Sequence, residues 1–375
     1  MVGIVFNYEI EGANMDDLKK VYVECKQFIN GNGPRNISIL TEAFEDLDTN
    51  ISSDMYGQGA WIDAFQEELA REAGKEAGVF FPSGTMAQQI ALRIACDRKK
   101  IYSIAYHPLA HLEIHEQDGL KKLHQIKTIL LGDQERLLTL QDIKSIEQPI
   151  SCILIELPQR EMGGYLPDYA DLVEISKYCQ EKGIHLHLDG ARLFEVLPYY
   201  KKTLQEICVL FDSVYLSFYK GIGAVAGAVL LGNHNFCKEA KVWKRRYGGD
   251  LISLYPYIIP ANYYMDRRRP LMETYYEKAK DLAALLNKIQ GVATYPQIPV
   301  SNMFHVSIEG SREKLTEALV KLYHSTGIGF TNNIKEKVGG QCFFEVSIGD
   351  ALLKLEDHEI DNFIKEFDEL LKNNK

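Results

Sequence analysis

Three short stretches of this 375-residue chain place reactive side chains beside glycine turns. The first, His185-Leu-His-Leu-Asp-Gly-Ala-Arg192, has the pattern of an apolar strand that ends in an acid, a glycine and a base. The second, Ser213-Val-Tyr-Leu-Ser-Phe-Tyr-Lys220-Gly-Ile-Gly, brings a lysine out of an apolar strand just before a glycine-rich turn. The third, Pro82-Ser-Gly-Thr-Met-Ala, carries two hydroxyls where a strand turns into a helix.

Each stretch has a chemical and a structural interpretation. A lysine in apolar surroundings loses its proton readily and becomes a nucleophilic amine, as a Schiff-base enzyme requires, but Lys220 could also extend from a sheet edge into water. Asp189 and Arg192 could bind a ligand at a strand end or form a salt bridge that caps a helix. Free N–H groups at a helix start bind phosphate, yet Ser-Gly-Thr also caps ordinary helices.

Taken together, the three stretches favour the chemical interpretation. In chain order they supply a phosphate site, an acid for a pyridinium nitrogen and a lysine for an aldehyde. These are the protein groups that pyridoxal 5′-phosphate needs.

Further motifs between Tyr56 and Gly232 make the chain resemble a known family, the threonine aldolase and aromatic amino acid β-eliminating lyase group of fold-type I pyridoxal-phosphate enzymes. The motifs that carry the resemblance occur in family order: Tyr56-Gly-Gln-Gly, Phe81-Pro-Ser-Gly-Thr-Met-Ala, Ala110-His111 with Glu116 and Gly119, Glu156 with Gly163-Gly164, and His187-Leu-Asp-Gly-Ala-Arg192.

The resemblance implies roles for the reactive groups. Lys220 would form the Schiff base with the cofactor aldehyde and later carry a proton. Asp189 would keep the pyridine nitrogen protonated. Arg192 would contact the phenolic oxygen of the ring or the substrate carboxylate.

The resemblance also assigns the rest of the cofactor site. Ser83, Gly84 and Thr85 would bind the phosphate, and Ser217, three residues before the lysine, would assist. By its register in the motif, His111 would stack on the cofactor ring, with His107 and His115 as competing histidines.

Two departures from the family pattern concern the substrate. Gln159, expected to contact the substrate, stands where threonine aldolases carry a histidine near the substrate hydroxyl, and glutamine cannot serve as a general base. The carboxylate-binding arginine of the small domain also has no counterpart near Phe343-Phe-Glu-Val-Ser347. Arg160, Arg245 or Arg246 could take its place.

The expected activity is that of a lyase of amino acid metabolism. It would cleave a β-hydroxy amino acid into glycine and an aldehyde, as threonine aldolases do. Because the fold and the cofactor do not fix which bond breaks, β-elimination or transamination on the same scaffold is the alternative. A protein that binds the cofactor without catalysis is a third possibility.

The elements that must position these residues alternate between strands and helices. Strands are expected at 79–81, 101–105, 128–131, 151–155, 184–188, 213–216 and 225–231, with helices at 61–73 and 168–182 among those between them. This alternation predicts an α/β fold with a mainly parallel sheet covered by helices, followed by a smaller α+β domain. We expect an N-terminal segment over 1–54, a large cofactor-binding domain over 55–264 and a small domain over 265–375.

Composition narrows the choice of partners and compartment. The net charge of −10 argues against nucleic acid and acidic membranes as main partners. The start of the chain carries acid where a secretory signal carries base, and the seven cysteines include no Cys-x-x-Cys pair. These features predict a soluble cytoplasmic protein, and we expect no bound metal. The resemblance implies a small amino acid as substrate. The resemblance further implies a homodimer or homotetramer with shared active sites.

Overall fold

A computed structural model describes residues 14–45, 47–48, 50–337 and 340–373 of the chain. The acidic N-terminal stretch, from which we inferred that no secretory signal is present, lies outside these residues. The chain divides into two compact units: a large unit of residues 34–276, and a small unit in which 277–375 join 1–33. The boundary expected at residue 264 falls within helix α12 (Tyr255–Arg268), and the chain passes to the small unit within helix α13 (Met272–Leu286).

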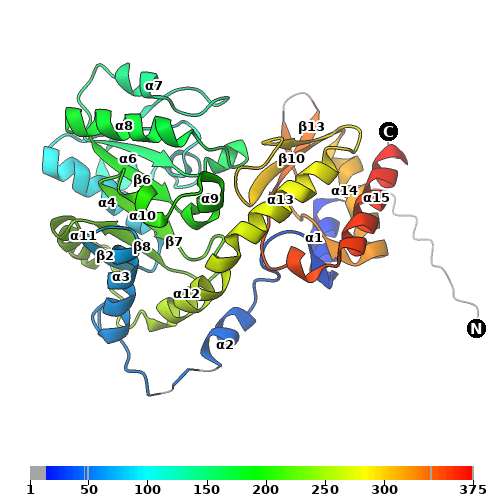
Figure 1. Cartoon of the computed structure of the whole chain (residues 1–375), viewed down its shortest axis with the longest axis horizontal. Coiled ribbons are helices and arrows are strands. Elements are labelled where there is room, and N and C mark those ends of the chain that lie inside the picture. The colour runs from blue at the N-terminus through cyan, green and yellow to red at the C-terminus, as the bar shows by residue number, and fades with distance from the viewer. Residues whose placement is uncertain (1–13, 46, 49, 338–339, 374–375) are drawn as a thin grey trace, which may run out of the picture. The chain divides into compact units, whose positions relative to one another are not determined.

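The large unit is built around one twisted sheet (Figure 1). Its strands are β2 (Ala77–Phe81), β3 (Ser103–Tyr106), β4 (Lys127–Leu130), β5 (Cys152–Glu156), β6 (His185–Gly190), β7 (Ser213–Ser217) and β8 (Ala228–Gly232). Its other helices are α2 (Ser38–Phe44), α3 (Ala60–Glu72), α4 (Gly84–Lys99), α5 (His111–Ile114), α6 (Gly119–His124), α7 (Leu140–Lys144), α8 (Tyr169–Lys182), α9 (Leu193–Tyr200), α10 (Leu204–Cys208) and α11 (His234–Arg246), with 3₁₀ turns η1 (Arg160–Met162) and η2 (Arg269–Leu271).

The strand order is β2-β8-β7-β6-β5-β3-β4, and every neighbouring pair from β7 to β4 is parallel, as expected. The exception is β8, which runs antiparallel to both β7 and β2. Only residues 218–227 connect β7 to β8, which is too short for the helical crossover that a parallel pair needs. The expected alternation of strand and helix therefore stops at this hairpin.

Side-chain alternation along β2 shows how both faces of the sheet are covered. Val79 and Phe81 pack with the apolar residues of α4 and α11. Phe80 points to the other face, where its ring lies 6.1 Å from that of Phe65 on α3. Successive strand residues face opposite sides, so burial on both faces explains why these strands are continuous apolar runs.

The small unit holds an antiparallel sheet in the order β12-β13-β10-β9 and a short parallel pair of β1 and β11. Its strands are β1 (Gln27–Phe28), β9 (Val292–Tyr295), β10 (Met303–Glu309), β11 (Ile328–Gly329), β12 (Lys335–Lys337) and β13 (Gln341–Ser347), and its helices are α1 (Met15–Glu24), α14 (Arg312–Thr326), α15 (Asp357–Asn373) and the 3₁₀ turn η3 (Leu352–Lys354).

Helix α1 lies in the N-terminal segment, where the sequence analysis names no helix. Asn14 accepts the backbone N–H of Asp16 and Asp17, and Asp17 accepts the backbone N–H of Asn14 in return. Asn at this position with an acid three residues later is a recognisable capping box, so a local signal for this helix was present.

No helix in the described part of the chain is long and apolar enough to cross a membrane. Within the same residues, no group of three or more His, Cys, Asp or Glu side chains is arranged to hold a metal ion.

Candidate active site

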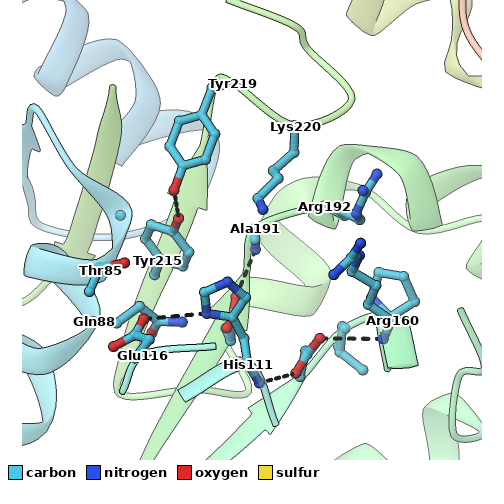
Figure 2. Close-up of a pocket in the computed structure, with 15 residues that line it drawn as sticks. Thr85, Gln88, His111, Glu116, Arg160, Ala191, Arg192, Tyr215, Tyr219 and Lys220 are labelled. Carbon is cyan, nitrogen blue, oxygen red and sulfur yellow. Dashed lines mark hydrogen bonds and ion pairs between the residues drawn. The ribbon is translucent and has the colours of Figure 1, made fainter. Parts of the chain in front are cut away.

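The three sequence motifs meet at one cavity in the large unit (Figure 2). Its wall is formed by Gly84, Thr85, Gln88, His111, Glu116, Glu156, Leu157, Pro158, Arg160, Asp189, Ala191, Arg192, Tyr215, Tyr219 and Lys220.

The topology explains why these residues meet. Strands β2, β3, β5, β6 and β7 all run in one direction, so their carboxyl ends share one edge of the sheet. Glu156 and Asp189 are paired neighbours at the ends of β5 and β6. Lys220 follows β7 by three residues, and Gly84 begins α4 just after β2. Open α/β sheets bind their ligands at this edge.

The start of α4 is shaped to receive an anion. Ser83 is its N-cap and accepts the backbone N–H of Met86 at 3.4 Å. At Gly84, a Cβ atom would lie 2.0 Å from the Tyr215 hydroxyl and 2.4 Å from that of Tyr219, so only glycine fits. Gly84 and Thr85, the first two residues of this 16-residue helix, line the cavity, and the N–H groups at a helix start are suited to bind an anion.

One buried donor of the cavity wall, Gln88 Nε2, lacks a hydrogen-bond partner among the described residues, whereas Ser217 is not part of the wall. An unpaired buried donor costs about 1–3 kcal/mol, so this atom indicates that a polar ligand belongs here. Together with the glycine at position 84, the amine of Lys220 and the acid of Asp189, it fits a phosphorylated pyridine aldehyde.

The loop that carries Lys220 is held by side chains from three other segments of the large unit. Arg35 donates to the carbonyl oxygens of Tyr219 and Val225, both at 3.2 Å. The buried Arg268 donates to the carbonyl of Ile222 at 2.7 Å. Glu195 accepts the backbone N–H of Gly221 at 2.9 Å. Figure 2 shows the resulting direction of Lys220, whose amine points into the cavity.

Asp189 lies in the cavity wall with its carboxyl almost fully buried, and burial raises its pKa. It accepts the backbone N–H of Ala191 at 3.1 Å, which favours the charged form. Burial, and then the Asp189 carboxyl beside it, raise the pKa of Glu156. A protonated pyridine nitrogen next to Asp189 would restore the charged form of this carboxyl.

His111 is the histidine of this cavity, and two carboxylates position it. Its Nδ1 lies 3.3 Å from Glu116 Oε1, while its backbone N–H donates to Glu156 Oε2 at 3.1 Å. Gln89 donates to the other oxygen of Glu116 at 2.9 Å. A Cβ at Gly119 would meet the Gln89 amide at 2.3 Å, so this glycine of the family motif makes room for the group that orients Glu116.

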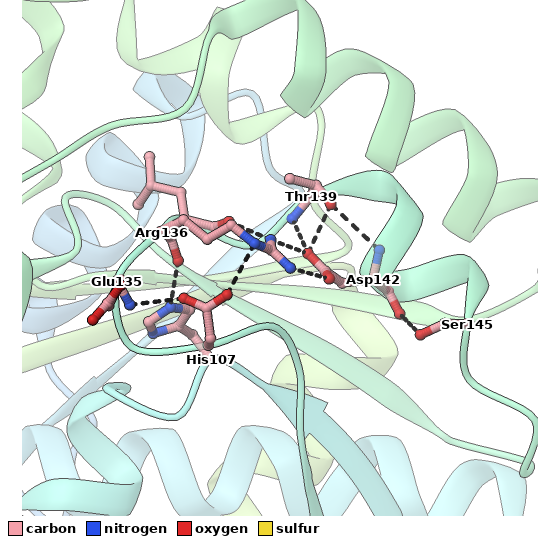
Figure 3. Close-up of polar contacts among 8 residues, drawn as sticks. His107, Glu135, Arg136, Thr139, Asp142 and Ser145 are labelled. Carbon is pink, nitrogen blue, oxygen red and sulfur yellow. Dashed lines mark hydrogen bonds and ion pairs between the residues drawn. The ribbon is translucent and has the colours of Figure 1, made fainter.

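The two competing histidines have other partners. Figure 3 shows His107 in a separate polar network, where its Nε2 lies 2.9 Å from the Arg136 carbonyl and its Nδ1 accepts the N–H of Leu109. Arg136 is itself fixed by Asp142 through two contacts of 2.7 Å. His115 Nε2 pairs with Glu161 at 2.8 Å. Neither histidine is part of the cavity wall.

The position expected for Gln159 differs from the one observed. Its amide donates to the Leu109 carbonyl at 2.9 Å, and it lines a second, largely apolar cavity. The next residue, Arg160, lines the Lys220 cavity instead. Arg245 and Arg246 lie elsewhere, over the rings of Tyr56 and Trp243 respectively.

Sequence reasoning also gave no role to a buried chain of polar groups behind the cavity. His187 Nε2 lies 2.8 Å from Gln88 Oε1, and its Nδ1 lies 2.7 Å from Ser213 Oγ. Burial lowers the pKa of His187 to about 3, so the imidazole is neutral. The spacing of His187 and Asp189 on one strand face was the available signal, but the Gln88 partner comes from a distant helix.

A lysine whose amine points into the cavity, an acid at a strand end and a phosphate-type helix start, on an open α/β sheet, define the class: a pyridoxal-phosphate enzyme of fold type I. The model of the Beta-eliminating lyase family matches residues 43–309, and the chain belongs to this family. Solved structures that share the fold include pyridoxal-phosphate enzymes at 15% and 16% identity, and at this identity they show the fold alone.

Closer relatives are also known. A Listeria monocytogenes structure, provisionally described as an L-allo-threonine aldolase, is 54% identical with a TM-score of 0.93, over 95% of this chain and 99% of that one. An Exiguobacterium structure, provisionally described as an aromatic amino acid β-eliminating lyase/threonine aldolase, is 50% identical with the same TM-score, over 94% and 99%. The low specificity L-threonine aldolase of Saccharomyces cerevisiae is 34% identical over 55% of this chain and 54% of its own length.

Proposed function

We propose that this chain is a pyridoxal-phosphate lyase that cleaves a β-hydroxy amino acid of the threonine type into glycine and an aldehyde. One observation carries the proposal: the Lys220 amine, the Asp189 carboxyl and the start of α4 line one cavity. The names of the similar Listeria and yeast proteins support the choice of substrate.

In this proposal each group of the cofactor has a residue to hold it. Lys220 would hold the aldehyde carbon, Asp189 the ring nitrogen, and Ser83, Gly84 and Thr85 the phosphate, assisted by Ser217. When bound, pyridoxal 5′-phosphate supplies an electron sink that stabilises negative charge on the substrate Cα.

The residues around the cofactor site would accept and donate the protons of the reaction. Cleavage of the Cα–Cβ bond requires that the β-hydroxyl lose its proton while the bonding electrons move to Cα. Because Glu116 lies against Nδ1 of His111, Nε2 of this ring is the nitrogen that can accept the hydroxyl proton, and Glu116 stabilises the resulting positive charge. The Lys220 amine, which points into the cavity, would then deliver a proton to Cα. Gln159, which lines the second cavity, takes no part.

The test is product analysis with L-threonine and L-allo-threonine. We expect glycine and acetaldehyde in equal amounts from the parent protein and no detectable turnover from Lys220→Ala. Turnover at the parent rate in Lys220→Ala would refute the proposal.

β-Elimination is the second candidate, favoured by the family match and by the absence of a histidine at position 159. Ammonia and an α-keto acid, without glycine, would identify it. Pyridoxamine phosphate with a keto acid would identify transamination, and an unchanged cofactor spectrum with every amino acid would identify a non-catalytic protein.

We further propose a cytoplasmic homodimer or homotetramer with shared active sites. The seven cysteines are all buried as free thiols, which suits a reducing compartment. The mass of the purified protein in solution would test the assembly.

A further inference from the structure

We infer that the hydroxyls of Tyr215 and Tyr219 recognise the phosphate group of the cofactor at the start of α4. Neither residue belongs to the Ser83-Gly84-Thr85 turn, to which the sequence motif assigns the phosphate. The inference rests on the proposed function, because it takes a phosphorylated pyridine aldehyde as the ligand. It gives the site a means of distinguishing this aldehyde from the same aldehyde without phosphate.

Both phenols reach the first residue of α4. A Cβ atom at Gly84 would lie 2.0 Å from the Tyr215 hydroxyl and 2.4 Å from the Tyr219 hydroxyl, and both side chains line the cavity together with Gly84. Tyr215 is part of β7, is 3% exposed and packs with apolar residues of α4, whereas Tyr219 directly precedes Lys220. An anion bound at this helix start would therefore lie next to both hydroxyls.

The pair of phenols has a proton to donate. The two hydroxyl oxygens lie 3.2 Å apart, so one phenol donates to the other. Each phenol carries one O–H, and their mutual hydrogen bond uses one of the two protons. The second proton can be donated to a ligand. Because a hydrogen bond to a charged acceptor is stronger than one between neutral hydroxyls, a phosphate oxygen would be a favourable acceptor.

The arginines of the cavity wall lie away from the phenols. Figure 2 shows Tyr215 and Tyr219 on one side of the cavity and Arg160 and Arg192 on the other. The amine of Lys220 is reserved for the aldehyde in the proposed function. On the side of the phenols, the donors available to an anion are hydroxyls and the N–H groups of the helix start, and such groups bind phosphate without an arginine.

A second observation on the same helix indicates a polar ligand. Gln88 lies one turn after Gly84, on the same side of α4, and lines the cavity. Its side chain is buried, and its Nε2 has no hydrogen-bond partner among the described residues. The start of the helix is therefore not the only feature of this wall that indicates a ligand.

Titration of the full-length protein, freed of cofactor, with pyridoxal 5′-phosphate and with pyridoxal separates recognition of the phosphate from recognition of the ring and aldehyde. In Tyr219→Phe we expect pyridoxal 5′-phosphate to bind about 10- to 100-fold more weakly, the loss typical of a hydrogen bond to a charged group, while pyridoxal binds as it does to the parent. Tyr215→Phe should show the same selective loss, and the double variant a larger one. Absorbance of the bound aldehyde measures each affinity.

Tyr247→Phe is the matched control and should leave both affinities unchanged, because the Tyr247 hydroxyl lies 3.1 Å from His124 Nε2 and is not part of the cavity wall. Parent-like binding of pyridoxal 5′-phosphate in the double variant would overturn the inference. Equal weakening of both aldehydes would also overturn it, because Tyr219 would then act on Lys220, whose Nζ lies 5.4 Å from the centre of its ring.

Equal affinity of the parent for the two aldehydes would likewise contradict recognition of the phosphate. Failure of the proposed function looks different, since the parent would then bind neither aldehyde. Circular dichroism and thermal unfolding of each variant show whether it is folded.

Discussion

Replacement of Glu195 by alanine tests how the lysine loop is held. Glu195 is 1% exposed, pairs with Arg192 and accepts the N–H of Gly221. The space beside Gly221 is filled by this carboxyl, since a Cβ there would lie 2.1 Å from Glu195 Oε1. Glu195→Ala removes a charge partner of Arg192 and one anchor of the loop in one step.

The size of the effect follows from burial. Breaking a buried ion pair by removing one partner costs about 3–5 kcal/mol. For a unit of this size, each kcal/mol lowers the melting temperature by about 2–4 °C, so we expect a fall on the order of 10 °C. Glu195→Gln keeps an acceptor for the N–H of Gly221, so its melting temperature should fall by less. Because the loop of Lys220 is held less firmly in this variant, a smaller fraction of the purified protein should carry cofactor.

Thermal unfolding and cofactor absorbance measure the two effects. Glu239→Ala is the matched control, because Glu239 forms an exposed pair with Arg98 at 2.9 Å and such pairs contribute at most about 1 kcal/mol. A melting temperature within 2 °C of the parent together with full cofactor content in Glu195→Ala would refute our account of the Arg192–Glu195 pair.

Two further predictions concern the cofactor cradle and the buried imidazole. Gly84→Ala should yield folded protein with little cofactor, measured by absorbance, because the added methyl would meet the hydroxyls of Tyr215 and Tyr219. The second prediction concerns His187, because burial lowers the pKa of its imidazole from 6.5 to about 3. The unfolded chain then binds a proton that the folded protein rejects, and stability falls as pH drops from about 6.5 towards 3. His187→Gln should reduce this slope by up to about 1.4 kcal/mol per pH unit, measured by urea unfolding between pH 7 and 4.

Each of these two predictions has its own control. Full cofactor content in Gly84→Ala would show that the phosphate site lies elsewhere. For His187→Gln the comparison with the parent matters, because the buried carboxyls have raised pKa values and contribute the opposite slope in both proteins. Equal slopes in variant and parent would mean that His187 is protonated in the folded state or exposed to solvent.

The sequence by itself singled out residues that meet at one cavity. Lys220, Asp189 and the Ser-Gly-Thr turn could be found because each lies within a few residues of a strand end, where strand pattern and turn glycines are local signals. The parallel sheet followed from the alternation of apolar strands with helices, and with it the expectation that these ends meet at one edge. Helix α1 also has a local signal in the sequence, the capping box at Asn14.

The tertiary structure decided which neighbours these residues have. Gln159 and Arg160 are adjacent in the chain, and only the path of the turn after β5 sends one side chain to the second cavity and the other to Lys220. The partners Glu195 for Gly221 and Glu116 for His111 come from separate segments brought together by packing. The pKa of Asp189 depends on burial by the whole large unit, and no local pattern encodes that quantity.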